Sequence, residues 1–283
     1  MQYFVKMEFS PLMAEQIGPA DAERFLASGF HGVEVSYVQP YLDTWQTFDY
    51  LERVQYLKEA GAEFTVHGPL VDVNLSSLNR TVRRTALTQF KECLDFAQQL
   101  GGSLVVVHPV MSILGLPDGP WNQDDFQPAS TRMQEMLMAG HDRCVLALQE
   151  LADYAPRLRI GVENLVYPHE RYRSPSQLAA LLDDVKRSNV GATLDIGHAW
   201  CSGHDPAAFV EVLGSKLFHV HCHDNHGQRD EHLPIGEGTI DMARVFQALA
   251  IAEYKGILNF ECHCPETDLA WVRSHFTDLE TSQ

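Results

Sequence analysis

The stretch RTVRRTALTQFKECLDFAQQLGGSLVVVH, residues 80–108, contains the structural unit from which the chain is built. Apolar residues recur at helical spacing over 80–100, and Gly101 and Gly102 then form a helix-stop signal. The apolar run at 103–108 follows at once and favours a buried strand. A helix that leads through a tight turn into a buried strand is typical of parallel βα architecture.

The same rhythm extends outward over the whole sequence. Short β-branched or aromatic runs predict eight strands, at 3–9, 32–37, 63–67, 103–108, 159–164, 191–196, 216–222 and 256–261. Segments of helical period predict eight helices, at 19–28, 47–60, 80–100, 131–153, 175–188, 205–214, 241–252 and 266–280. Ser174-Pro175 and Asp205-Pro206 are helix-start signals. Eight alternations predict a (β/α)8 TIM barrel in which residues 1–283 form a single domain.

Two connections are longer than the others, at 109–130 after the fourth strand and at 224–240 after the seventh. Long connections inside a compact domain are usually functional. In a TIM barrel, the segments that follow the strands surround the face on which active sites are found. We therefore expect both connections to border the site.

Charge and cysteine content limit the classes of function. The chain has 38 Asp and Glu against 21 Lys and Arg, a net charge of −17, which argues against a broad nucleic-acid-binding face. The six cysteines show no disulfide or zinc-knuckle spacing and are expected to be reduced thiols. We find neither a signal peptide nor an apolar run long enough to span a membrane. These features predict a cytoplasmic protein with no membrane partner.

The sequence has 14 histidines, and several of them fall at the ends of predicted strands together with carboxylates. Because those ends converge on one face of a TIM barrel, the residues there are expected to form one site. Imidazole and carboxylate suit divalent zinc, manganese, cobalt or magnesium. Nine residues are the candidate metal ligands: His67, His108, Glu163, Asp195, His198, His221, Asp230, His232 and Glu261.

Three histidines alternate along the seventh predicted strand and should share one face. His221 is the candidate ligand among them. His219 is expected to lie deeper in the barrel, and His223 is a candidate partner of a ligand.

Seven strings in this part of the chain, in this order, resemble the xylose-isomerase-like TIM-barrel superfamily. They are VHGPLVDVNLSS, VVVHP, GVENL, TLDIGH, HVHCHDN, DEHLPIGEGTID and NFECH. The resemblance extends over about 63–262 and includes two branches with different chemistry. One branch contains sugar and sugar-phosphate isomerases and epimerases, and the other contains endonuclease IV.

The isomerase and epimerase branch implies one divalent metal, Mn, Co, Mg or Zn. The ligands that it implies are Glu163, Asp195, His221 and Glu261, of which the two glutamates also act as the acid/base pair. The residues expected on the substrate side are His198, Glu34, His67 and His108. The reaction would move a proton next to a metal-bound carbonyl of a small sugar.

The endonuclease IV branch implies up to three zinc ions and hydrolysis of a phosphoester, at an abasic site in DNA or in a small phosphodiester. His67 and His108 would hold one ion, with Glu163 bridging to the central one. His198, Asp230 and His232 would hold the third.

Several departures argue against duplex DNA as the substrate. The first strand has KMEFS at 6–10, without the family's His. The stretch SYVQPYLDTW at 36–45 lacks its Arg, and Leu70 lies near the position of its Tyr. The leading hypothesis is therefore a sugar or sugar-phosphate isomerase or epimerase, and the alternative is a three-metal phosphoesterase. The retained glutamates argue against a barrel that only binds a metal or a carbohydrate. Oligomeric state is left open.

Overall fold

Eight parallel strands, each paired with the next along the chain, close into a barrel when β8 pairs with β1. The computed structural model describes residues 1–7, 18–37, 54–70, 73–109, 131–167 and 170–276. The strands are β1 (Gln2–Lys6), β2 (Gly32–Ser36), β3 (Glu63–His67), β4 (Leu104–Val107), β5 (Arg159–Glu163), β6 (Val190–Asp195), β7 (Leu217–Cys222) and β8 (Ile257–Phe260). This closed topology confirms the predicted (β/α)8 TIM barrel. The extent of the single domain, residues 1–283, stays a prediction.

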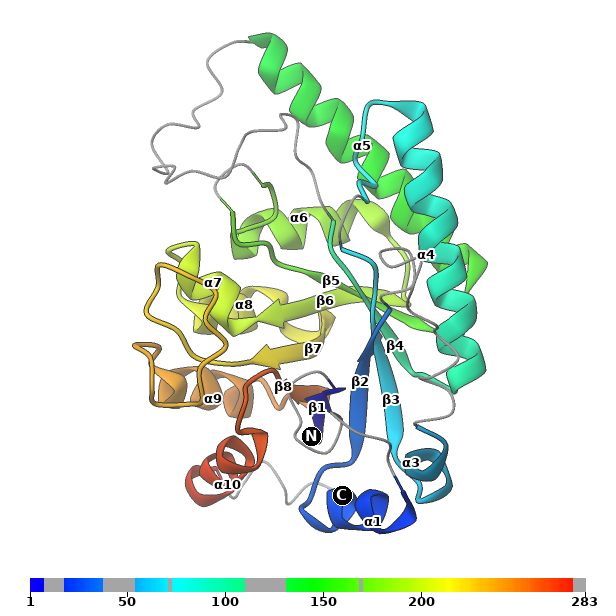
Figure 1. Cartoon of the computed structure of the whole chain (residues 1–283). Coiled ribbons are helices and arrows are strands. Elements are labelled where there is room, and N and C mark those ends of the chain that lie inside the picture. Colours follow the sequence, from blue (N-terminus) through cyan, green and yellow to red (C-terminus); the bar gives the residue numbers. More distant parts are fainter. Residues whose placement is uncertain (8–17, 38–53, 71–72, 110–130, 168–169, 277–283) are drawn as a thin grey trace.

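Helices surround the strands, as Figure 1 shows. The described helices are α1 (Pro19–Ala27), α3 (Gln55–Glu59), α4 (Arg80–Leu100), α5 (Thr131–Tyr154), α6 (Pro175–Val185), α7 (Ile196–Cys201), α8 (Pro206–Leu213), α9 (Met242–Ile251) and α10 (Pro265–His275). None of these helices is long and apolar enough to cross a membrane.

The boundaries of several elements follow from the local sequence. The Asn79 side chain caps the start of α4, and Gly101 ends that helix in the left-handed conformation at φ 83°. Ser174 and Gln177 form a capping box at the start of α6. Asp205 caps α8 by accepting the backbone N–H of Ala207. The start and stop signals in the sequence therefore predict where these elements begin and end.

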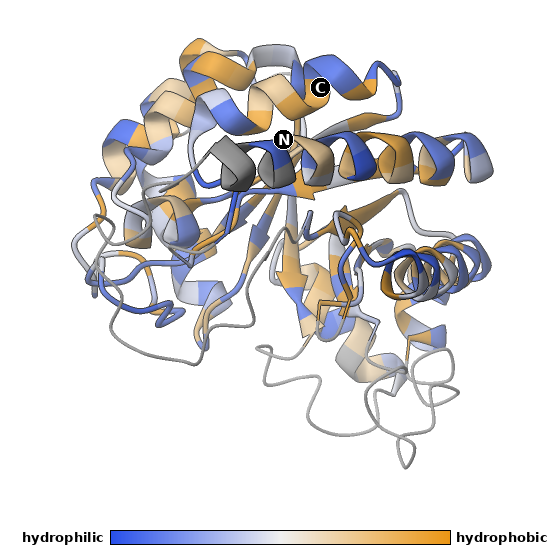
Figure 2. Cartoon of the chain, turned by 90° about the horizontal axis from the view of Figure 1, so that it is seen from above, coloured by the Kyte–Doolittle hydropathy of each residue, from blue (hydrophilic) through white to orange (hydrophobic). Residues whose placement is uncertain are grey.

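The strands contribute mainly apolar side chains to the core, and the helices are amphipathic. All four residues of β4 are buried, as are the six of β6. Figure 2 shows apolar colouring on the central strands, with polar and apolar stretches mixed along the outer helices. Buried charged and polar side chains are concentrated where the strands end, and this concentration defines the candidate site.

One prediction needs correction, and parts of others fall outside the described residues, among them 8–9 of the predicted strand at 3–9 and 277–280 of the predicted helix at 266–280. The sequence pattern predicts no helix between the sixth strand and 205, but α7 occupies Ile196–Cys201. The pattern misses it because a six-residue helix shows too little periodicity to be detected. The segment 47–53 of one predicted helix lies outside the described residues. So does 110–130, nearly all of the first long connection.

Candidate active site

All nine candidate ligands are described, and close contacts join them into one cluster at the carboxyl ends of β3 to β8. Most of them are buried, with exposed fractions of 3% or less at His67, Glu163, Asp195, His221 and Glu261. The structure thus brings together every residue that the sequence selects as a ligand.

His221 lies at the centre of the cluster, and its Nδ1 atom faces three carboxylates. That nitrogen lies 3.1 Å from Glu261 Oε1, 3.4 Å from Glu163 Oε1 and 3.7 Å from Asp195 Oδ2. It is buried and, like Nε2 of the same ring, makes no hydrogen bond within the described part of the chain. A buried nitrogen without a donor or acceptor partner, surrounded by carboxylate oxygens, fits one divalent cation with mixed nitrogen and oxygen ligands.

A second group lies on one side of this centre. Glu163 Oε2 is 2.9 Å from His108 Nε2 and 3.5 Å from His67 Nε2. The other ring nitrogen of His67 lies 3.0 Å from the carbonyl oxygen of Gly68, which orients the ring toward Glu163. The two oxygens of Glu163 therefore face different groups, as expected for a carboxylate that bridges two positions.

A third group lies on the other side of the centre. Asp230 Oδ2 is 3.1 Å from His232 Nε2 and 3.3 Å from His198 Nε2. His232 has a φ of 50°, a left-handed conformation that non-glycine residues rarely adopt and that is often found at functional sites. The ligand atoms of Asp230 and His232 form a close group with His223 rather than with His198, and two imidazoles with one carboxylate are a ligand set that suits zinc.

The third group owes its position to the loop that follows β7. Asp224 and Leu233 exchange two backbone hydrogen bonds, which turn the chain back over the mouth of the barrel. The buried Asp224 carboxylate also accepts the backbone N–H groups of Gly236 and Ile240. The predicted functional connection at 224–240 is thus organised by its own hydrogen bonds and places Asp230 and His232 at the site.

Local structure also positions the residues after β5 and β6. Asp195 caps α7 by accepting the backbone N–H of His198 at 2.6 Å, so the turn that ends β6 places both side chains at the site. The Asn164 side chain accepts the backbone N–H of Asp195 and donates to its carbonyl oxygen. The backbone carbonyl of Asn164 lies 3.0 Å from His198 Nδ1. Asn164 therefore ties the end of β5 to the end of β6.

The carboxylates and imidazoles of the cluster stabilise one another's charged forms. Burial alone would raise the pKa of Glu163, but the neighbouring His108 and His221 rings outweigh it and hold that pKa well below the usual value. Burial lowers the pKa of His221, yet the carboxylates of Glu261, Glu34 and Glu163 raise it well above normal. A field that stabilises protonated imidazole also stabilises a divalent cation, which would replace the protons on binding.

Two residues differ from what the sequence suggests. Lys6, at the end of β1, is not among the residues that the sequence selects, yet its Nζ atom lies 3.2 Å from Glu261 Oε2 and both side chains are buried. Lys6 is brought to the site by the end of β1 at that residue, whereas the sequence predicts a strand that extends to residue 9, so no signal in the sequence marks it. Glu34 is expected from the sequence on the substrate side, but it is fully buried within the barrel beneath His221.

His219 and His223 occupy the positions expected from the alternation along β7. His219 is fully buried two residues before His221, with its Nε2 atom 2.9 Å from Glu34 Oε2, and this confirms that it lies deeper in the barrel. His223 Nε2 is 3.3 Å from Asp195 Oδ2 and 3.5 Å from Asp230 Oδ1. It therefore contacts two of the candidate ligands.

The chain is similar to proteins from both branches that the sequence suggests. An uncharacterized protein from Methanocaldococcus jannaschii is 34% identical over 222 residues, 74% of this chain and 69% of that protein. A protein named probable endonuclease 4 from Mycobacterium marinum is 26% identical over 273 residues, covering 93% of this chain and 98% of that protein.

The fold comparison identifies a further relative. The solved structure of a D-tagatose 3-epimerase-like protein superposes with a TM-score of 0.75 at 28% identity, over 99% of this chain and 98% of that one. The family model named xylose isomerase-like TIM barrel matches residues 22–278. With the closed barrel and the cluster at its mouth, these matches show that the chain belongs to the xylose isomerase-like TIM-barrel family.

Proposed function

We propose that the chain is a metal-dependent isomerase or epimerase that acts on a small sugar or sugar phosphate. The observation that carries the proposal is the placement of two glutamates around one point. Glu163 and Glu261 each direct an oxygen to His221 Nδ1, at 3.4 Å and 3.1 Å, and they come from β5 and from the end of β8. Two carboxylates on different strands can reach a substrate from different sides.

In the proposed reaction, one glutamate removes the proton on the carbon next to the substrate carbonyl and the other returns a proton. Return to the opposite face inverts that carbon, whereas transfer between neighbouring atoms moves the carbonyl. Glu163, Asp195, His221 and Glu261 would hold a divalent ion that polarises the adjacent oxygens of the substrate.

The remaining residues of the cluster would bind and orient the substrate. His198 lies beside both Asp195 and Asp230, where its ring can donate to a substrate hydroxyl. Lys6 holds the second oxygen of Glu261, so the other oxygen stays directed to the centre. The similarity to a D-tagatose 3-epimerase-like protein supports a ketose as the substrate class.

A second candidate function, phosphoester hydrolysis at a three-metal centre, is favoured by one specific observation. Two further groups of potential metal donors lie beside the centre. One consists of His67 and His108, next to Glu163, and the other of Asp230 and His232, next to His198. The relatives named probable endonuclease 4 support this alternative. The net charge of −17 argues for a small phosphodiester rather than duplex DNA as its substrate.

A paired assay separates the two functions. The protein, loaded in turn with Mn, Co, Mg or Zn, is incubated with a panel of ketoses and their phosphates, and separately with abasic-site duplexes and small phosphodiesters. We expect interconversion of at least one ketose pair, loss of that activity with chelator, and recovery when the metal is returned. Phosphodiester cleavage without any ketose turnover would reject the epimerase and establish the alternative.

A further inference from the structure

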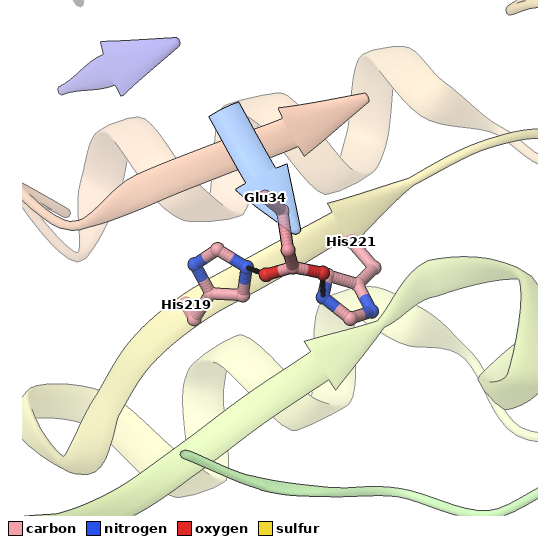
Figure 3. A group of neighbouring side chains, drawn as sticks. All are labelled: Glu34, His219 and His221. Carbon is pink, nitrogen blue, oxygen red and sulfur yellow. Dashed lines mark ion pairs between the residues drawn. The ribbon is translucent and has the colours of Figure 1, made fainter. Parts of the chain in front are cut away.

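A carboxylate and two imidazoles meet inside the barrel, below the candidate metal centre. Figure 3 shows Glu34 from β2 between the rings of His219 and His221 from β7. Glu34 Oε1 lies 3.0 Å from His221 Nε2, and Glu34 Oε2 lies 2.9 Å from His219 Nε2. All three side chains have an exposed fraction of zero. Glu34 therefore contacts these two rings and is not exposed at the mouth of the barrel.

The two nitrogens of His221 face different surroundings. Nδ1 faces the carboxylates of Glu163, Asp195 and Glu261, whereas Nε2 lies in contact with the Glu34 carboxylate. Neither nitrogen makes a hydrogen bond within the described residues, so the contact with Glu34 rests on the 3.0 Å distance. A neutral imidazole has one N–H and one lone pair, on opposite sides of the ring. A proton on Nε2, toward Glu34, leaves the lone pair on Nδ1 directed to the three carboxylates. That is the tautomer which a metal ligand at this position requires.

The Glu34 carboxylate is itself held in place by uncharged groups. The Thr65 hydroxyl donates to Oε2 at 2.9 Å, and the Asn259 amide donates to Oε1 at 3.2 Å. The same amide donates to Glu261 Oε1 at 3.2 Å. Glu34 is thus connected to two candidate ligands, to His221 by direct contact and to Glu261 through Asn259.

We propose that Glu34 is a positioning residue for the metal centre: it keeps the His221 proton on Nε2 and directs Nδ1 to the metal. Carboxylates that accept the second N–H of a metal-binding histidine fix its orientation and increase its basicity. This role replaces the substrate contact suggested by the sequence, because the buried carboxylate lies on the far side of the His221 ring from the centre. The inference rests on the proposed metal-binding role of His221, but it holds for either reaction.

The substitution that tests this role is Glu34→Gln, which keeps the shape of the side chain and removes its charge. Affinity for Zn or Co is measured by competition with a chromogenic chelator, without substrate. Loss of such a partner typically weakens metal binding by about 10- to 100-fold, and we expect a loss in this range. In a His221→Asn background the same substitution should change metal affinity little further, because the imidazole that Glu34 would orient is already absent.

The matched control is Asp268→Asn, which removes another fully buried carboxylate charge. Asp268 contacts Cys262 and the backbone of Ile235, and neither is a candidate ligand. Metal affinity should be unchanged in this variant. The proposal would be overturned if Glu34→Gln lost no more metal affinity than Asp268→Asn. It would also be overturned if Glu34→Gln caused the same loss with and without His221.

Two further measurements separate this positioning role from direct ion binding and from a folding defect. If Glu34 and the two histidines themselves bound an ion, Glu34→Gln would lower the number of ions per chain rather than the affinity, and this result would overturn the proposal. If Glu34→Gln fails to fold, nitrogen NMR of the metal-loaded wild type decides. We expect a slowly exchanging proton on His221 Nε2, and a proton on Nδ1 would contradict the role.

These results are independent of the reaction assay. A chain that binds metal with the expected dependence on Glu34 but turns over no ketose would refute the epimerase and leave this inference intact.

Discussion

Lys6 and Glu261 form a buried ion pair at the ends of β1 and β8, the two strands whose pairing closes the barrel. Their side chains are 10% and 2% exposed. Removal of one partner from a buried pair typically costs about 3–5 kcal/mol, because the other charge stays buried without compensation. Glu261 would keep the Asn259 amide at 3.2 Å and His221 Nδ1 at 3.1 Å. We therefore expect Lys6→Met to cost about 3 kcal/mol, at the lower end of that range.

The assay is urea denaturation in the presence of chelator, so that bound metal does not add to stability. Lys91→Met is the matched control, because Lys91 lies 2.6 Å from Glu150 in a pair whose side chains are 31% and 50% exposed. An exposed pair contributes about 1 kcal/mol or less, and the control should lose no more than that. If both variants lost equal amounts, the argument that burial makes the Lys6 pair important would be refuted.

Three further predictions concern pH, packing and metal content. Burial raises the pKa of Asp268 to about 6 from an ordinary 3.8, so the folded state binds the proton more tightly and stability falls as pH rises from about 4 to above 6. Over this pH range, the free energy of unfolding of the wild type, measured by urea denaturation, should fall by about 3 kcal/mol relative to that of Asp268→Asn. The same pH dependence in both proteins would contradict this prediction. A Cβ on Gly197 would overlap the ring of His223. Gly197→Ala should therefore lower the free energy of unfolding by about 1–3 kcal/mol, measured by thermal denaturation. An unchanged melting temperature would refute this close approach of ring and backbone. Elemental analysis of His232→Ala should find the wild-type metal content if one central ion is bound, and the loss of one ion would favour the three-metal alternative.

Much of this fold could be predicted from the sequence, because its signals are local and repeated. The Gly101-Gly102 stop and the Ser174-Pro175 start lie where α4 ends and α6 begins. The nine candidate ligands could be assigned to one face because the ends of parallel barrel strands converge. Periodicity and topology together are therefore sufficient to locate the cluster.

The remaining features depend on packing between strands that are far apart in sequence. Lys6 meets Glu261 across 255 positions, and no local pattern marks a lysine as part of a site. Glu34 occurs near the end of a predicted strand, where a carboxylate can point to solvent, to substrate or into the barrel. Its contact with His221 is set by how β2 and β7 face each other across the barrel, and the sequence of neither strand contains that information.

In the proposed reaction, Glu163 and Glu261 remove and return a proton on the carbon next to the substrate carbonyl. The most direct test is turnover of a ketose in deuterated water by the metal-loaded protein, with deuterium located by mass spectrometry and NMR. We predict deuterium on the carbon that changes, and none when Glu163→Gln or Glu261→Gln replaces the wild type. Turnover without deuterium at that carbon, or incorporation that persists in both variants, would contradict proton transfer by the two glutamates.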